Sequence, residues 1–169
     1  MFQRFRANGP ALFVPLAWVV VGAAHVGFVS LQALTIAHAV MAIMLAGFVV
    51  LSRDDMRAGA LRTWWIIVAI GFVITTTGLV GLLSTPLNRG LLHIAIGGWM
   101  LLPAIGFIDT GRRSNAALLT TFGAAVISIA GMVVYFISGS GNEMAVMIAG
   151  LVLVGVGQTI GIVDAVIRY

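Results

Sequence analysis

ALTIAHAVMAIMLAGFVVL, residues 33–51, is an apolar stretch in which His38 is the only ionisable side chain. A helix needs roughly 20 mostly apolar residues to cross about 30 Å of hydrocarbon, so this stretch predicts a transmembrane helix. On either side of it lie five further stretches of the same kind, at about 11–31, 63–84, 89–108, 115–138 and 143–166. Together they predict an all-α integral membrane protein, a six-helix bundle forming a single transmembrane domain over residues 1–169.

The composition of the whole chain agrees with this prediction. Hydrophobic residues make up 61% and charged residues 8% of its 169 residues, whereas a soluble domain carries about 25% charged residues. The six stretches leave no room for a soluble domain, so we expect any chemistry inside the bundle or at its rims. The chain contains no cysteine, which excludes disulfides, thiolate metal sites and cysteine nucleophiles.

The arginines are divided unevenly between the two sides that the alternating spans define. Only Arg89 falls on one side, and the other eight cations fall opposite: Arg4, Arg6, Arg53, Arg57, Arg62, Arg112, Arg113 and Arg168. Arginine-rich short loops stay in the cytoplasm, so we expect a multi-pass protein of the cell membrane with both termini cytoplasmic. This asymmetry accounts for the net charge of +4. Without a reading motif on a basic face, we expect no nucleic-acid partner.

Repeated motifs suggest that the spans form three tandem helical hairpins. VGFVS (residues 26–30) recurs 54 residues later as VGLLS (residues 80–84), and three aspartates recur at a spacing of 55: Asp54, Asp109 and Asp164. His38 and His93 share the spacing of 55. One interpretation is triplication of a hairpin with parallel topology. The other is that apolar spans resemble one another by chance.

Three histidines inside the expected membrane are the candidate functional residues. His25 lies near the outer end of the first span, and His38 and His93 lie near the outer starts of the second and fourth. At 1.5 Å per residue, all three sit roughly 6–9 Å below the edge of the hydrocarbon. An ionisable group at this depth is costly and therefore indicates function. The common depth suggests a cofactor site shared by the three histidines.

Haem b and, as a lesser possibility, copper are the cofactors that these residues suit. Haem needs one or two imidazole ligands and room beside them, which Gly97, four residues after His93, would supply. Copper suits imidazole together with thioether, and Met41 follows His38 by three residues. Two further methionines lie at similar depth: Met144 and Met147. The alternative for each histidine is a hydrogen bond to a neighbouring helix, and for each methionine ordinary packing.

The remaining polar and small residues are expected to be structural. Each aspartate is expected to pair with a following arginine: Asp54 with Arg57, Asp109 with Arg112 and Asp164 with Arg168. Three glycines are expected to permit close helix contact: Gly150, Gly157 and Gly161. Three threonines are expected to bond to their own backbone: Thr75, Thr76 and Thr77. Gln158 lies mid-membrane and needs a partner that the sequence does not identify.

Three motifs between residues 37 and 91 carry a resemblance to a known family. Ala37-His38 stands early in the second span, an inner loop with arginine and aspartate leads into Ile66-Ile67-Val68, and an outer loop ends in Pro86-x-Asn88-Arg89-Gly90-Leu91. This third of the chain resembles styrene oxide isomerase, a small membrane enzyme. The resemblance implies that His38 is the axial ligand of haem b at a subunit interface. It also implies that ferric iron acts as a Lewis acid in rearranging a small apolar epoxide to an aldehyde.

The chain departs from that family at two positions and in its number of spans. The family has asparagine where this chain has Met44, and tyrosine where the nearest match is Val80; it also has four spans. Three functions therefore stay open. They are a haem-b-binding homo-oligomer, in its narrower form an epoxide isomerase; a non-catalytic subunit or scaffold of a larger membrane complex; and a small transporter.

Overall fold

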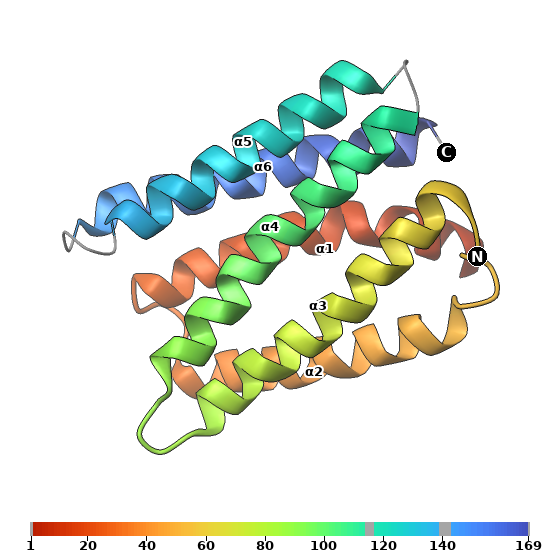
Figure 1. Cartoon of the computed structure of the whole chain (residues 1–169). Coiled ribbons are helices and arrows are strands. Elements are labelled where there is room, and N and C mark those ends of the chain that lie inside the picture. The colour runs from red at the N-terminus through yellow and green to blue at the C-terminus, as the bar shows by residue number, and fades with distance from the viewer. Residues whose placement is uncertain (1, 114–116, 139–142, 169) are drawn as a thin grey trace.

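Six helices make up the described part of the chain (Figure 1). The computed structural model describes the backbone of residues 2–113, 117–138 and 143–168, and the side chains of residues 13–113, 117–138 and 143–167. The helices are α1 (Phe2–His25), α2 (Leu31–Leu51), α3 (Gly59–Leu83), α4 (Arg89–Arg113), α5 (Leu118–Ser138) and α6 (Met144–Arg168). Helices α2 to α6 are long and apolar enough to cross a membrane, and the part of α1 with described side chains, Phe13–His25, is also apolar. The predicted all-α, six-helix fold is confirmed.

The connection between the first two helices differs from the predicted boundaries. α1 ends at His25 instead of residue 31, because Gly27 adopts a φ of 82° and the amide of Phe28 returns to the last turn of the helix. The hydroxyl of Ser30 then accepts a hydrogen bond from the amide of Ala33 at 3.1 Å and caps α2. A tight turn therefore occupies residues 26–30, which are apolar enough to look like membrane span.

Three other boundaries also move by four residues or more. α1 begins at Phe2, before the predicted residue 11. α3 begins at Gly59, before the predicted residue 63, and α4 continues through Asp109 to Arg113, past the predicted residue 108. The predicted start of the fifth span, residue 115, lies outside the described residues. In each of these cases the helix continues into polar residues beyond its apolar stretch, so hydropathy alone places the boundary inside the helix.

The helices pack in the order α1, α6, α5, α4, α3, α2, and the contact between α5 and α6 is the most extensive. Figure 1 shows α1 running behind α4, and α2 at the edge of the bundle beside α3. Two expected hairpins are therefore packed pairs, α3 with α4 and α5 with α6. In the first hairpin α1 packs on α6 instead, and α2 packs extensively on α3 alone.

The core sits on the last three helices. One buried cluster comprises Ala104, Phe107, Ala124, Ala125 and Ile162, and a second comprises Met100, Tyr135, Leu151 and Val154. The expected role of the three glycines is confirmed: Gly150 and Gly157 lie against α5, and Gly161 lies against Phe107 of α4. By contrast, Ala42 is the only buried residue of α2. The fold is thus a tight α4–α6 core with α2 at its periphery.

Both termini lie at one end of the bundle, together with the α2–α3 connection (Figure 1). Five of the arginines assigned to one side lie at this end: Arg53, Arg57, Arg62, Arg112 and Arg113. Arg89 begins α4 at the opposite end. The side chains of Arg4, Arg6 and Arg168 are outside the described residues.

Candidate functional site

The three histidines lie toward the same end of the bundle, but they do not form one group. His25 is the last residue of α1, and His38 and His93 stand early in α2 and α4. Among the described residues, which include all three, no set of three histidine, aspartate or glutamate side chains could hold a metal ion together. The equal depth inferred from the sequence is thus not accompanied by convergence.

His25 uses both of its ring nitrogens in hydrogen bonds. Nδ1 lies 2.8 Å from the carbonyl oxygen of Val21 in its own helix, and Nε2 lies 2.9 Å from the hydroxyl of Tyr135 on α5. With the proton on Nδ1, Nε2 accepts from the tyrosine hydroxyl. The rings also meet edge to face, with centroids 5.7 Å apart. His25 therefore ties α1 to α5 and has no lone pair left for a metal.

His93 is exposed and contacts a different residue of α5. Its ring meets Phe136 edge to face, with centroids 6.3 Å apart. The room that Gly97 was expected to leave for a cofactor is taken by the same phenylalanine, because a Cβ at this glycine would lie 3.1 Å from Cζ of Phe136. His25 and His93 therefore each contact one of two adjacent aromatic residues of α5, Tyr135 and Phe136.

His38 is half-buried between α2 and α3 and differs from the other two. Its Nδ1 is 3.0 Å from the carbonyl oxygen of Leu34, one turn earlier in α2. A Cβ at Gly78 of α3 would lie 3.2 Å from Cδ2 and 3.4 Å from Nε2 of the ring. The imidazole therefore occupies space that is open because Gly78 has no side chain. No described residue forms a hydrogen bond with Nε2. His38 alone combines an anchored Nδ1 with an uncommitted Nε2.

The methionines divide between two places. Met41 is half-buried on the same helix as His38, and Met44 is 46% exposed. Met147 packs against the second core cluster on α6, a helix that makes no extensive contact with α2. The α6 methionines are therefore separated from His38, and Met41 is the one thioether near it in sequence and on the helix.

Gln158 has the hydrogen-bond partners that its burial demands. The side chain is 2% exposed, and its Oε1 accepts from Nε1 of Trp18 on α1 at 2.9 Å. Its Nε2 donates to the carbonyls of Trp99 at 2.8 Å and Met100 at 3.4 Å on α4. The carbonyl of Trp99 would ordinarily accept from the amide of residue 103, but Pro103 has none. Gln158 thus supplies the hydrogen bond that the proline removes.

The network of side-chain hydrogen bonds around Gln158 continues from α4 to α3. Nε1 of Trp99 donates to Oγ1 of Thr75, which is 3% exposed, at 2.9 Å. The expected backbone bonding is confirmed for Thr76 and Thr77, whose hydroxyls donate to carbonyls four residues earlier. Side-chain hydrogen bonds therefore link α1, α6, α4 and α3 across the middle of the bundle.

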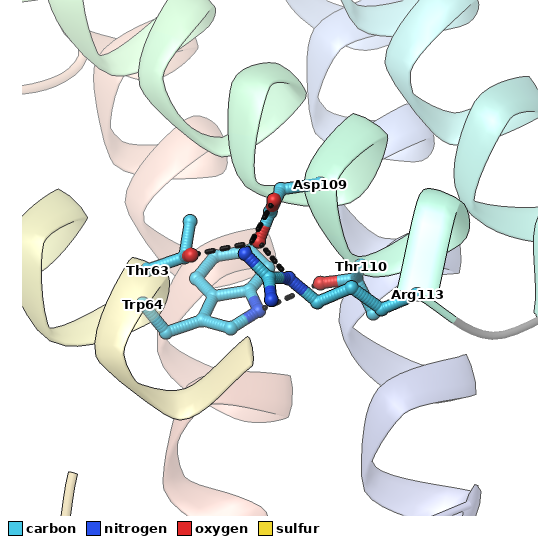
Figure 2. A network of polar contacts seen from close by, with 5 residues as sticks. All are labelled: Thr63, Trp64, Asp109, Thr110 and Arg113. Carbon is cyan, nitrogen blue, oxygen red and sulfur yellow. Dashed lines mark hydrogen bonds and ion pairs between the residues drawn. The ribbon is translucent and has the colours of Figure 1, made fainter. Parts of the chain in front are cut away.

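A second hydrogen-bonded network joins α3 and α4 near the end of the bundle at which both termini lie (Figure 2). Asp109 accepts from Thr63 at 2.7 Å and from Arg113 at 2.8 and 3.0 Å, and Nε1 of Trp64 donates to Thr110 at 3.2 Å. The expected pairing of Asp109 with Arg112 is therefore wrong. Residues four positions apart lie on the same face of a helix, so Arg113 is placed beside Asp109.

The other two expected aspartate pairs have different outcomes. Asp54 pairs with Arg57 as expected. The expected partner of Asp164 is Arg168, whose side chain lies outside the described residues.

No family model, curated protein or solved structure matches the chain. The fold by itself defines the class: an all-α protein of six helices in the described residues, five of them suited to crossing a membrane.

Proposed function

We propose that this chain is a multi-pass protein of the cell membrane, with both termini in the cytoplasm, that binds haem b through Nε2 of His38. The length and hydropathy of α2 to α6 support the lipid bilayer as its surroundings. The clustering of arginines at the end that carries both termini supports the orientation.

The state of His38 carries the proposal. A histidine that donates from Nδ1 to a backbone carbonyl has its tautomer and ring orientation fixed, and it presents the lone pair of Nε2 to a metal. His38 has this arrangement through the carbonyl of Leu34. His25 does not, because Tyr135 occupies its second nitrogen. His93 lacks a described hydrogen bond to orient its ring.

The residues around His38 fit a flat, apolar group held by one ligand. A single axial imidazole is enough for haem. The side chains on the same face of α2 as His38 are apolar and half-buried: Leu34, Met41 and Leu45. When bound, haem would supply an iron centre able to act as a Lewis acid. Copper is the lesser alternative, with Met41 as the added ligand.

The position of α2 at the edge of the bundle supports a homo-oligomer. α2 packs extensively on α3 alone, so a group bound at His38 is covered by this chain on one side only. A second copy of the chain would complete the enclosure. The proposal therefore includes self-association through α2, in line with the interface position implied by the resemblance.

Epoxide isomerase activity on a small apolar substrate is the narrower form of the proposal. Met44 and Val80 stand where the similar family has polar residues, and they are 46% and 51% exposed apolar side chains. They can provide apolar contact to a substrate but no hydrogen bond. Haem binding is independent of these two positions.

The alternative is a non-catalytic subunit of a larger membrane complex. It is favoured by the number of polar side chains already satisfied within the bundle, such as His25 and Gln158. In this case α2 would pack against another protein, and His38 would bond to it. A small transporter is less favoured, because the mid-membrane polar groups form a closed network between helices.

The test is an absorption spectrum of protein purified from cells supplied with a haem precursor. We expect a Soret band in the unaltered protein and its loss in His38→Ala, because no other imidazole combines an anchored Nδ1 with a free Nε2. His93→Ala is the matched control and should retain the band. A colourless unaltered protein that co-purifies with other membrane proteins would favour the subunit alternative, and a band that survives His38→Ala would exclude His38 as the ligand.

A further inference from the structure

A cavity of about 620 Å³ lies at the α2–α3 connection, at the opposite end of the bundle from the histidines. It is lined by Arg53, Asp54, Met56, Arg57, Arg62 and Trp65. Ligand pockets in proteins commonly measure about 300–1,000 Å³. The cavity is thus large enough for a small organic group, and none of its residues contributes to the proposed haem site.

The charge of the cavity is positive. Three arginines and one aspartate line it, which leaves two positive charges in excess. Asp54 pairs with Arg57, and both side chains are more than 70% exposed, so this pair is easily exchanged for another partner. Arg53 and Arg62 form no ion pair with any described residue. Two guanidinium groups are therefore available to an anion.

The start of α3 adds to the positive field. Arg62 and Trp65 stand in the first two turns of this 25-residue helix. The N-cap residue is Ala58, whose side chain makes no capping hydrogen bond, and the first turn has no acidic residue. The first amides of the helix are therefore uncapped by side chains, and their dipoles favour a negative group beside them.

The wall of the cavity is held in place and, in the proposed membrane orientation, lies at the level of lipid headgroups. Nε1 of Trp65 donates to the carbonyl of Val49 at 3.0 Å, which ties the first turns of α3 to the last turn of α2. Both helices are long and apolar enough to span a membrane, and the cavity lies where they emerge. Tryptophan and arginine are the residues that favour this interface.

We infer that this cavity binds a phosphate group, supplied either by the headgroup of an acidic phospholipid or by a free phosphate compound. Arginine recognises phosphate through paired charge-assisted hydrogen bonds, and Arg53 and Arg62 are the residues free to form them. Asp54 opposes the anion, so the cavity gains affinity when this carboxylate is neutralised.

The test measures binding of phosphatidylglycerol and phosphatidylcholine to the purified full chain in detergent, by native mass spectrometry, with inorganic phosphate titrated separately. We expect Arg53→Gln/Arg62→Gln to weaken phosphatidylglycerol binding by about tenfold or more, since each charge-assisted hydrogen bond is lost. Asp54→Asn should strengthen it. Arg89→Gln, an exposed arginine at the other end, is the matched control and should change it less than about twofold.

The outcomes separate the two sources of phosphate. Preference for phosphatidylglycerol without saturable binding of inorganic phosphate assigns the site to a headgroup. Saturable binding of inorganic phosphate, lost in the double variant, assigns it to a free compound. Equal binding of the two lipids with no phosphate binding would overturn the inference, as would an unchanged affinity in both the double variant and Asp54→Asn. If the double variant folds poorly, Asp54→Asn still tests the inference. Its expected effect is stronger phosphatidylglycerol binding, which a folding defect would not produce.

Discussion

Gly150→Ala should lower the free energy of unfolding by about 2–3 kcal/mol, because overpacking of this size forces the backbone to move. A Cβ at this position would lie 2.6 Å from the amide nitrogen of Tyr135 and 2.8 Å from the carbonyl oxygen of Gly131, both on α5. Neither is the end of a flexible side chain, so the helices have to separate. The contact between α5 and α6 is the most extensive in the bundle, and its loss reaches the second core cluster.

Gly123→Ala on α5 is the matched control. A Cβ at this glycine meets nothing within 4 Å, so the substitution adds no clash. It should raise stability by about 0.5–1 kcal/mol, because alanine loses less backbone freedom than glycine on entering a helix. Unfolding in mixed micelles, followed by circular dichroism, measures both variants. Equal effects of the two substitutions would show that helix propensity, not close approach, governs these positions.

The helices could be predicted from the sequence because their apolar stretches are long and nearly free of charge. The end of α1 could not be predicted in this way, since Val26, Phe28 and Val29 continue the apolar run through a turn. The local signal is the pair Gly27 and Ser30, one in the left-handed region and the other an N-cap. Hydropathy averages over such single residues and therefore extends the span.

The end of the bundle at which the three histidines lie could be predicted, but not the direction in which each one points. A membrane helix is apolar on the lipid side as well as on the protein side, so the sequence carries little information about its rotation. His25 shows the consequence. Its partner, Tyr135, is 110 residues away, and the chain has only two tyrosines. A search of the sequence for hydroxyl side chains able to bond to each histidine would have identified Tyr135 as a candidate partner of His25.

The packing order of the helices also could not be predicted. Short outer connections favour hairpins of neighbouring helices, and α3–α4 and α5–α6 follow this rule. α1 instead packs on α6, where Trp18 reaches Gln158 and lies 3.2 Å from where a Cβ of Gly155 would stand. Contacts between the first and last helices have no local signature in the sequence. The loss of the α1–α2 pair is what leaves α2, and with it His38, at the edge of the bundle.

Gln158→Leu should destabilise the fold by about 2–3 kcal/mol, because it leaves one donor and one acceptor between the helices unsatisfied at once. The donor is Nε1 of Trp18 and the acceptor is the carbonyl of Trp99, both part-buried partners of this side chain. Leucine fills the space of the glutamine side chain with apolar atoms, so hydrogen bonding is the main contribution that the substitution removes. Thr159→Val is the matched control on α6, since its hydroxyl bonds only to the carbonyl of Gly155 in its own helix.

Pro103→Ala separates the role of the proline from that of the glutamine. Alanine restores an amide that can donate to the carbonyl of Trp99, so this carbonyl no longer depends on Gln158. Gln158→Leu should therefore cost about 1 kcal/mol less in a Pro103→Ala background than in the unaltered chain, a coupling typical of directly interacting groups. The four unfolding curves of this double-mutant cycle measure the difference. Strict additivity would contradict the assignment of Gln158 as the donor that replaces the missing amide of Pro103, because two groups serving the same carbonyl cannot act independently.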